Sequence, residues 1–492
     1  MSDPRLTYRF GPLERRGLLG GMHVGQVGVL ALATALAIAA LDASPSASGA
    51  LLALIVIGVA LAAATVPVAG RSVCEWLPLA IGLLARRICG RAQFRSCAPV
   101  RGVRLGGGAP AARPVATPAL SGLRIVELPY RGRQVGAISE QRGRRLTITL
   151  ACRVGTFSLL DPDVQQRRLA RWGIVLSSAA GTAIRRMQWI ERTAPAQGDA
   201  LARWLHDERD PAVPLRGTPL IESYLELIGD TTRVSQDHEI LLSVQVDARR
   251  ARGRGPAAGH TALLEEAERV AQGLEAAEVT VSGALSPGQL AQALRTAHDP
   301  FAGAELTALQ TADSSRDGIE EASAWPLGAN ERWDHYRSDG ALHTTYWIAA
   351  WPRVEVSPMF MDALLARSSA VRAVGVVFEP IPPGRSTREV EAAITRDRAD
   401  GELRRRFGQS ETARQRQANE ATMRREAELA AGHGEVRFSG FVTVSGRDQE
   451  DLRRACADVL DHAARARLEL HCMYGQQAEA FTFTLPVCRG LA

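Results

Sequence analysis

The amino-acid sequence predicts an α+β protein in which an N-terminal transmembrane hairpin of two helices precedes a mixed α/β region in the cytosol. Two long runs without a charged residue, 24–41 and 50–68, predict the hairpin. Strand-like and helix-like patterns then alternate along the rest of the chain, which predicts the mixed region. The order strand–helix–strand at 239–282 recurs at 435–473, so we expect duplicated βαβ units of the split, ferredoxin-like kind.

Each uncharged run has 18 or 19 residues, enough for a helix to cross the roughly 30 Å hydrocarbon core of a bilayer. The eight residues between the runs, 42–49, are sufficient only for a turn. A cleaved signal peptide is one alternative, but a second run of spanning length would not follow it. Two buried core helices are another, but such helices usually carry a polar stripe, which both runs lack. We therefore assign residues 23–69 to a transmembrane hairpin.

Arginines flank the predicted hairpin on both sides, whereas the loop inside it carries only Asp42. The positive-inside rule therefore predicts a multi-pass protein of the plasma membrane with both termini in the cytoplasm. We expect the bilayer to be contacted by residues 24–68 and by these juxtamembrane side chains. They are Arg5, Arg9, Arg15, Arg16, Arg71, Arg86, Arg87, Arg91, Arg95, Arg101 and Arg104.

The charge of the chain is unevenly distributed. The formal net charge is +6, but residues 1–104 alone carry +7, so the remainder is close to neutral. Direct nucleic-acid binding is therefore not expected, despite a pI of about 9.2. All 59 basic residues are arginines. The absence of lysine excludes a P-loop lysine, a Schiff-base lysine and a lysine general base.

Three segments around the hairpin have distinct compositions. Residues 1–22 form a short cytosolic arm. Residues 70–97 read as an interfacial amphipathic helix, with Trp76 at one end and a pair of arginines at the other, although a first core helix of the soluble region is the alternative. Residues 98–121 hold three consecutive glycines and four prolines, which predict a linker.

We divide the remainder into a first α+β domain at 122–300, a connecting segment at 301–340 and a second α+β domain at 341–492. In the first domain we expect strands at 123–128, 134–139, 144–152, 184–190, 239–247 and 278–282, and helices at 161–176, 199–206, 219–228, 263–274 and 286–297. The second domain contains a charged helical insertion at 386–431, which begins with a capping box of Ser386 and Glu389 and stops at Gly432. The pattern of this insertion predicts an αα-hairpin or a bent helix. Its role is either that of a solvated helix pair or that of a docking surface for a partner.

No catalytic or metal-binding motif stands out. The sequence lacks GxxxxGK[ST], GxSxG, HExxH and a GxGxxG between strand and helix. Polar clusters fall at element boundaries, where they cap helices or face solvent: His206-Asp207-Glu208, Asp237-His238-Glu239, His298-Asp299 and Asp334-His335. The nearest approach to a metal site is Cys456, His462, His471 and Cys472, which read as core residues. We expect seven free thiols, no catalytic, cofactor-binding or metal-binding residue, no cofactor and no enzymatic activity.

Several stretches resemble a family of actinobacterial integral membrane proteins found with conjugation-type secretion genes. They are the start YRFGPLERRG at 8–17, the hairpin, the WLP at Trp76 and the ending QAEAFTFTLPVCRGL at 477–491. The hairpin resembles the PrgI-type subunit of type IV secretion systems, and the soluble part resembles the non-nucleotide-binding half of VirB-type traffic ATPases. In those ATPases a P-loop domain follows, whereas this chain stops at Ala492. The resemblance thus implies a membrane platform for a separate ATPase.

The expected function is a non-enzymatic inner-membrane scaffold of a conjugation-like, type IV-like secretion or DNA-transfer machine. It would dock a separate cytosolic VirB-type ATPase through residues 386–431 and assemble into a homo- or hetero-oligomer with other secretion subunits. An EccE-like component of a type VII secretion system is the alternative, because it also has two helices followed by a soluble domain. A membrane-tethered hydrolase is a third, and it would need a pocket that brings two of the histidine–acid clusters together.

Overall fold

The computed structural model describes the chain except at 1–23, 69–70, 97–115, 156, 196–218, 220–222, 224–235, 254, 303–318, 367, 407–412 and 492. The predicted arm 1–22, most of the predicted linker 98–121 and the cluster around His206 therefore lie outside the described residues. The same holds for the helices predicted at 199–206 and 219–228, apart from Pro219 and Ser223, which are helical.

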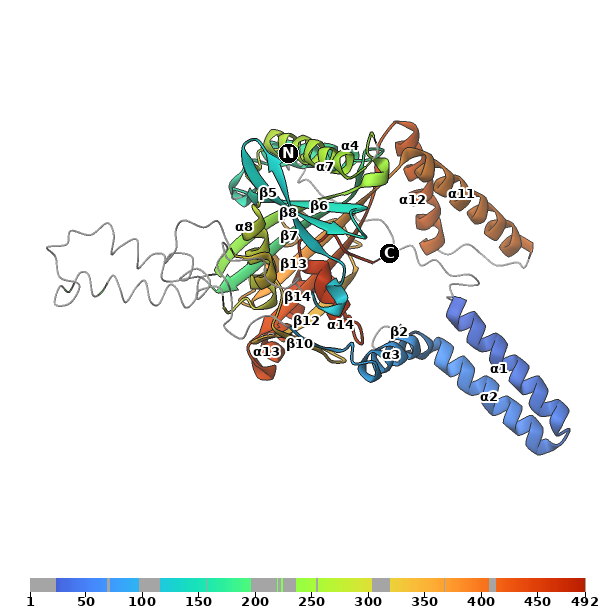
Figure 1. The fold of residues 1–492 in the computed structure, drawn as a ribbon. Helices are drawn as coiled ribbons and strands as arrows, with labels where there is room; N and C mark the ends of the chain where they lie inside the picture. The colour runs from blue at the N-terminus through green and yellow to red at the C-terminus, as the bar shows by residue number, and fades with distance from the viewer. Residues whose placement is uncertain are drawn as a thin grey trace.

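Two apolar helices near the N-terminus form a hairpin that projects from the body of the protein (Figure 1). They are α1 (Val24–Ala43) and α2 (Ala47–Thr65). Small side chains line their contact, which lets the two backbones approach closely; the buried residues there include Ala33, Ala37, Ala53, Ala60 and Ala64. Only 11% of the spanning stretch of α1 and 22% of that of α2 is buried. A core helix of a soluble protein would be mostly buried, so this exposure favours the membrane assignment.

The rest of the described chain is built on one antiparallel sheet of thirteen strands. Along the sheet the order is β3-β10-β11-β12-β14-β13-β7-β8-β6-β5-β4, with β15 added beside β12 and β9 beside β6. The strands are β3 (Gln93–Arg95), β4 (Arg124–Tyr130), β5 (Arg133–Glu140), β6 (Arg145–Arg153), β7 (Ile184–Pro195), β8 (Gln236–Asp247), β9 (Thr280–Ala284), β10 (Gly328–Glu331), β11 (Tyr336–Ser338), β12 (Ala341–Ala350), β13 (Arg372–Ile381), β14 (Glu435–Gly446) and β15 (Glu469–Cys472). The predicted α+β class, two apolar helices followed by a mixed region, is confirmed.

Helices cover one face of the sheet. Over β6 and β8, α4 (Pro162–Ser178) and α7 (Pro256–Ala276) bury an apolar core, which includes Leu242, Val244 and Val246 on alternate positions of β8 (Figure 1). In the other half α10 (Asp362–Leu365) and α13 (Gln449–Arg465) close a similar core. Trp189 on β7 contacts both cores, so these four helices share a face.

The opposite face is covered by α8 (Pro287–His298) and by the C-terminal segment, which begins with α14 (Gln477–Phe481). Polar side chains of the sheet hold this segment in place. The Gln188 amide donates to the Phe483 carbonyl at 2.7 Å and accepts from the Cys488 backbone N–H at 2.7 Å. The Gln245 amide donates to the Val487 carbonyl at 3.4 Å. The C-terminal segment is thus a structural layer of the fold, because these buried sheet amides need its backbone as partner.

The pairing of strands repeats between the two halves. In the first half β6 lies between β8 and β9, and β8 between β6 and β7; in the second half β12 lies between β14 and β15, and β14 between β12 and β13. Both halves therefore carry the strand order of a split βαβ arrangement. The duplication of a ferredoxin-like unit stays a prediction, which this pairing order supports. Strands β7 and β13 pair at the seam and make the sheet continuous.

The sheet also crosses the predicted domain boundaries. Strands β10 and β11 lie within the predicted connecting segment 301–340 and extend the second half of the sheet. Strand β3, in the predicted interfacial segment 70–97, pairs with β10. The boundaries at 122–300 and 341–492 stay predictions, and the described residues place one continuous sheet across both.

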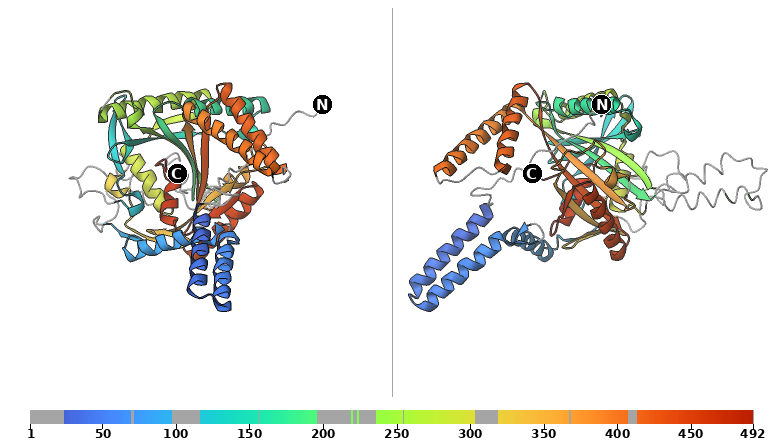
Figure 2. Two further views of the ribbon diagram at one scale, coloured as in Figure 1. Left: turned by 90° about the vertical axis from the view of Figure 1, so that its right-hand side faces the viewer. Right: turned by 180° about the vertical axis from the view of Figure 1, so that it is seen from behind.

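The charged insertion forms two helices, α11 (Pro383–Arg406) and α12 (Ala413–Ala430), between β13 and β14. They project from the same side of the body as the α1–α2 hairpin, as Figure 1 and the right panel of Figure 2 show. At the base of α11, Ser386 and Val390 are buried. Ion pairs of Glu389 with Arg437 and of Arg425 with Glu435 tie both helices to β14. An antiparallel helix pair is one of the two forms expected for 386–431.

A tight contact between β14 and α13 gives a first prediction. A Cβ atom at Gly446 would lie 2.5 Å from the backbone N and 2.6 Å from the Cα of Leu452. Because backbone atoms of a packed helix cannot move aside cheaply, we expect Gly446→Ala to destabilise the fold by roughly 1–3 kcal/mol. Thermal unfolding of the detergent-solubilised protein measures the effect.

The matched control for that substitution is Gly401→Ala in α11, where a Cβ atom would meet open space. Removing a helical glycine there should leave the Tm unchanged or raise it, since alanine is the better helix former by about 0.5–1 kcal/mol. Equal Tm values for the Gly446 variant and the unmodified chain would contradict the close contact.

Candidate functional site at the junction of hairpin and sheet

The segment after the hairpin forms α3 (Val73–Ile88), an amphipathic helix. It begins with a capping box in which the Ser72 backbone N–H donates to the Glu75 carboxylate at 2.9 Å. One apolar stripe of α3 is exposed, between 43% and 78% for each residue: Val73, Leu77, Ile81, Leu84 and Ile88. Their spacing of three and four places them on one face of the helix. This bare stripe supports the predicted interfacial placement over a core helix, which would bury such a stripe.

The other face of α3 contacts the sheet region through aromatic rings. Trp76 lies 5.7 Å from the Trp333 ring and 5.6 Å from the Tyr474 ring, centroid to centroid. Trp333 and Tyr474 in turn stack at 6.2 Å. Offset and edge contacts at these separations stabilise a contact beyond the area that they bury. The Trp76 predicted for the membrane interface therefore contacts protein as well.

An ion pair reinforces the aromatic contact. The Arg86 Nε donates to the Glu331 carboxylate at 2.9 Å, and the Glu331 side chain is only 3% exposed. The other Glu331 oxygen accepts from the Ala478 backbone N–H at 3.1 Å. Arg86 also donates to the Gly475 carbonyl. Glu331 thus joins α3, strand β10 and the C-terminal segment at one carboxylate.

The chain from the hairpin to the sheet is fixed at both ends. After α3, β3 adds to the edge of the sheet, with Phe94 opposite Ala329. Before α3, the Gln26 amide on α1 donates to the Ala64 carbonyl of α2 at 3.0 Å and to the Ser72 hydroxyl at 3.1 Å. Hairpin, α3 and sheet edge are therefore joined by hydrogen bonds. These contacts hold the hairpin against the edge of the sheet.

A family comparison bears on this region. A family model described as the putative type VII ESX secretion system translocon component EccE matches residues 242–348. The matched range runs from β8 to β12 and includes Glu331 and Trp333, the residues of the sheet that hold α3. The chain is similar to a secretion-system membrane family. A comparison with curated proteins gave no match.

This similarity agrees with the type VII alternative better than with the type IV-like prediction. The match lies in the mixed α/β region, in the part that was predicted to resemble VirB-type ATPases. It gives no support to a PrgI-like hairpin, to a VirB-like domain or to a link with conjugation. It does support a membrane component of a secretion system, together with the two apolar helices.

The histidines of the predicted polar clusters have different surroundings in the structure. His238 pairs with Glu191 on β7 at 2.8 Å. His335 pairs with its neighbour Asp334 at 2.8 Å, and His298 is fully buried beside Phe481. Among the described residues no hydrogen bond or ion pair joins one cluster to another. The described clusters therefore make separate contacts in the fold.

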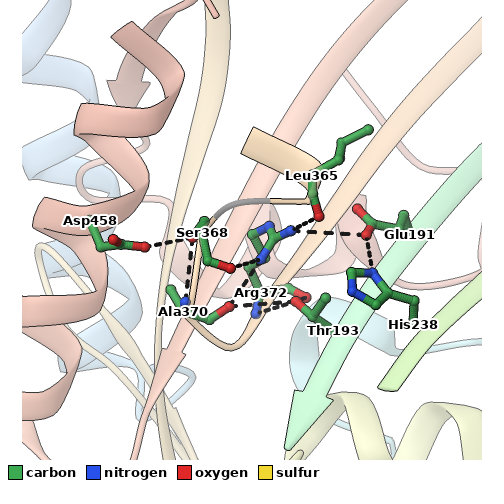
Figure 3. A network of polar contacts seen from close by, with 8 residues as sticks. All are labelled: Glu191, Thr193, His238, Leu365, Ser368, Ala370, Arg372 and Asp458. Atoms are coloured by element: carbon green, nitrogen blue, oxygen red, sulfur yellow. Dashed lines mark hydrogen bonds and ion pairs between the residues drawn. The ribbon is translucent and has the colours of Figure 1, made fainter. Parts of the chain in front are cut away.

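A buried network at the seam of the sheet was missed by sequence analysis (Figure 3). The Arg372 side chain on β13 is fully buried and donates to the carbonyls of Leu365, Ser368 and Ala370. Its guanidinium lies 3.9 Å from the Glu191 carboxylate, which also contacts His238. Burial lowers the pKa of Arg372, and the Glu191 carboxylate opposes that shift. Charged residues inside the apolar patterns of β7 and β13 were the available signal.

The same network continues to α13. The Ser368 hydroxyl donates to the Asp458 carboxylate at 2.6 Å, and the Thr193 hydroxyl donates to the Arg372 carbonyl at 3.2 Å (Figure 3). Strands β7 and β13, the loop before β13 and α13 are thereby fixed to one another. Carbonyl oxygens and the Glu191 carboxylate surround the buried guanidinium of Arg372, although its Nε and one oxygen of Glu191 lack a partner.

In the predicted cluster near the C-terminus, Cys456 and Cys472 pack against the core, whereas His462 and His471 form ion pairs with Asp458 and Glu469. Burial raises the pKa of Cys472 to about 12 and also raises that of Cys456. Such thiols stay protonated at neutral pH and are poor nucleophiles and poor metal ligands. Within the described ranges no three His, Cys, Asp or Glu residues are arranged to hold a metal ion, and the six cysteines described are free.

A buried histidine gives a second prediction, for pH. His343 on β12 is fully buried and hydrogen-bonded to the hydroxyls of Ser445 at 2.8 Å and Ser338 at 3.0 Å, and burial lowers its pKa to about 4. The folded state therefore keeps the ring neutral, while the unfolded chain protonates it near its ordinary value of about 6.5. Stability from this group is complete above pH 6.5 and falls by about 3 kcal/mol as the pH drops towards 4.

Thermal unfolding between pH 7 and 4 measures this effect. We expect the Tm of the unmodified chain to fall more steeply than that of His343→Gln, which retains a hydrogen-bonding amide without a titrating ring. The exposed His433 provides the control, since His433→Gln should leave the slope as it is. Parallel curves for all three proteins would show that His343 does not contribute.

Proposed function

We propose that this protein is an EccE-like membrane component of a type VII secretion system. It anchors a cytosolic sheet to the plasma membrane within a larger complex. The main support for this proposal is the family match over residues 242–348, because the matched range includes Glu331 and Trp333, which contact α3 next to the hairpin. The exposed α1–α2 hairpin and the exposed stripe of α3 supply the membrane-binding surface that such a role requires.

We infer a structural role without catalysis. Four of the described histidines form ion pairs with neighbouring acids, and two more, His298 and His343, are fully buried. Burial raises the pKa values of the thiols of Cys152, Cys456, Cys472 and Cys488. These groups are unsuited to general acid–base or nucleophilic work at neutral pH. The rigid junction and the continuous sheet suit a scaffold that holds other subunits.

The proposed topology has both termini in the cytoplasm. It is supported by the loop between α1 and α2, whose only charged residue is Asp42, and by the arginines after α2. A reporter that works only in the cytoplasm should be active when it is fused after residue 491, and a reporter that works only outside the cell should be inactive there. When inserted in the loop between α1 and α2, the second reporter should be active and the first inactive. Activity of the C-terminal fusion outside the cell would reject this topology.

The proteins that co-purify with this chain distinguish a type VII component from a conjugation-like scaffold. Purification of the complex from native membranes in detergent, followed by mass spectrometry, should recover an FtsK-type ATPase and other type VII membrane subunits. Recovery of a VirB-type ATPase instead would favour the conjugation-like scaffold. Loss of export of small WxG substrates in a strain lacking this chain is the functional test, and normal export would contradict the proposal.

The α11–α12 pair is the proposed docking element for a cytosolic partner. It is highly charged and projects from the body, with its base tied to β14. A variant that replaces residues 395–425 by a short linker keeps Ser386 and Val390 at the base of α11 but removes the Arg425–Glu435 pair, so its folding must be confirmed. It should lose one cytosolic partner from the purified complex and keep the membrane subunits. Recovery of every partner would contradict the docking role.

A further inference from the structure

A cavity of about 460 Å³ lies between the α3–β3 segment, the C-terminal segment and the sheet. Arginines from distant parts of the chain line it: Arg86, Arg91, Arg145, Arg185, Arg186 and Arg489. Its acidic residues are Glu140, Glu331 and Glu479. Six cationic against three anionic side chains leave a formal excess of three positive charges. Such an excess in a concave, partly desolvated wall attracts anions.

A bulge in β7 builds the most cationic part of this wall. Pairing with β8 is regular except between Ile184 and Arg186, where β7 holds one extra residue, Arg185. Ile184 and Met187 are both buried in the core under α4 and α7. In a regular strand, one of the two residues between them would face that core. The bulge instead turns both arginines to the cavity, which is how bulges re-aim side chains.

Two of the three acids on the wall form ion pairs. Glu140 pairs with Arg489 at 2.6 Å and with Arg145 at 3.7 Å, and Glu331 pairs with Arg86 at 2.9 Å. Arg186, which is 8% exposed, reaches Glu379 at 3.3 Å, but its Nε is buried without a partner.

Arg185 has no ion-pair partner within the described part of the chain. Its buried Nε lacks a partner, as do those of Arg145 and Arg186. Burial lowers the pKa of Arg185, and the charges of Arg145 and Arg186 lower it further. Of these three guanidinium groups, Arg145 pairs with Glu140 and Arg186 with Glu379, whereas Arg185 has no ion pair among the described residues. A bound anion would therefore relieve the repulsion that Arg185 meets from its two neighbours.

We propose that this cavity binds the phosphate group of a small phosphate ester through Arg145, Arg185 and Arg186. Guanidinium forks match phosphate oxygens, and a phosphate dianion offsets the excess charge better than one carboxylate. The rings of Phe94, Tyr336 and Phe483 line the same cavity and can contact the organic part. The volume lies within the range typical of small-molecule sites, about 300–1,000 Å³.

This ester has two possible sources, a soluble compound or a phospholipid headgroup. Arg86 lines the cavity from α3, whose exposed apolar stripe is the proposed membrane contact, so a headgroup is close to the site. The experiment therefore has two arms, both with the full chain in maltoside detergent. AMP probes the soluble source, and dioctanoyl phosphatidic acid below its micelle concentration probes the lipid source.

The readouts are the ligand-induced rise in Tm and the Kd from calorimetry. At least one probe should bind, and Arg185→Gln/Arg186→Gln should weaken that binding at least tenfold. Arg353→Gln, the same change at an exposed residue outside the cavity, should bind like the unmodified chain. Binding of AMP alone assigns a soluble ester, and binding of phosphatidic acid alone assigns a headgroup. Absence of both, or equal binding by the double variant, would overturn the proposal.

The single variant Arg185→Gln provides a test that does not depend on the double variant folding. Because it relieves repulsion, it should raise the Tm without ligand and reduce the ligand-induced rise. A purely structural arginine would give a lower Tm without ligand, which would also count against the site. Binding is measured on the purified chain, so a failure to bind would overturn the phosphate site and leave the proposed secretion role standing. Normal binding, together with normal export in a strain that lacks this chain, would leave the site standing and contradict the secretion role.

Discussion

Replacing Arg372 with methionine is expected to destabilise the protein by about 3–5 kcal/mol, the loss typical of one partner removed from a buried charge pair. The change removes the guanidinium beside the buried Glu191, which keeps its contact with His238, and it leaves the carbonyls of Leu365 and Ser368 without the donor that they have in the unmodified chain. Methionine retains most of the volume, so the loss reports on charge and hydrogen bonding. Chemical denaturation of the detergent-solubilised chain measures it.

Two further variants test the reason for this loss. Arg353→Met removes an exposed arginine and should change the stability by less than about 0.5 kcal/mol. Adding Glu191→Gln to Arg372→Met should recover part of the stability, because the buried negative charge is then absent. Recovery is incomplete, since the carbonyls of Leu365 and Ser368 still lack the Arg372 donor. A double variant as unstable as the single one would show that Glu191 is not coupled to Arg372.

Arginine at the middle of both apolar helices is expected to abolish stable membrane insertion. Leu32 on α1 is 62% exposed and Ile55 on α2 is 50% exposed, so both side chains face the surroundings of the hairpin. An arginine at the centre of a spanning helix costs about 2.5–3.5 kcal/mol of insertion free energy, so the pair costs about twice that. After carbonate extraction of the membranes, we expect the Leu32→Arg/Ile55→Arg variant to be absent from the membrane pellet, where the unmodified chain remains.

The controls for this variant separate charge from substitution. Leu32→Met/Ile55→Leu should stay in the membrane fraction. Leu159→Arg adds the same charge at a residue that is 83% exposed and lies outside the hairpin, and it should not change the distribution. The membrane assignment itself would be wrong if the unmodified chain were recovered as a monodisperse soluble protein without detergent.

Local sequence features were sufficient for most elements. The uncharged runs gave the positions of α1 and α2, and alternating apolar residues gave β6, β8, β13 and β14 within a few residues. The helices α8 and α13 follow from their caps, Ser286 and Asp448. These features are readable because period and capping depend on neighbours within one element.

Other features depend on residues far apart in the chain. Strands β10 and β11, short and weakly patterned, were read as a connecting segment and became strands because β12 and β3 supply their hydrogen bonds. The match to a secretion-system family likewise favoured the alternative reading, since the short motifs of the hairpin and the ending carried little specificity.

The sequence by itself determined that this protein carries two uncharged helices of bilayer length and a mixed, nearly neutral α/β body without lysine chemistry. Only the tertiary structure decided that β7 and β13 join two halves into one sheet and that Arg372 lies beside Glu191. It also decided that a bulge in β7 directs the side chains of both Arg185 and Arg186 towards one cavity. The physical reason is that periodicity and net charge are local or additive along the chain. Pairing across the sheet and burial of single charges are set by contacts between residues that may lie hundreds of positions apart.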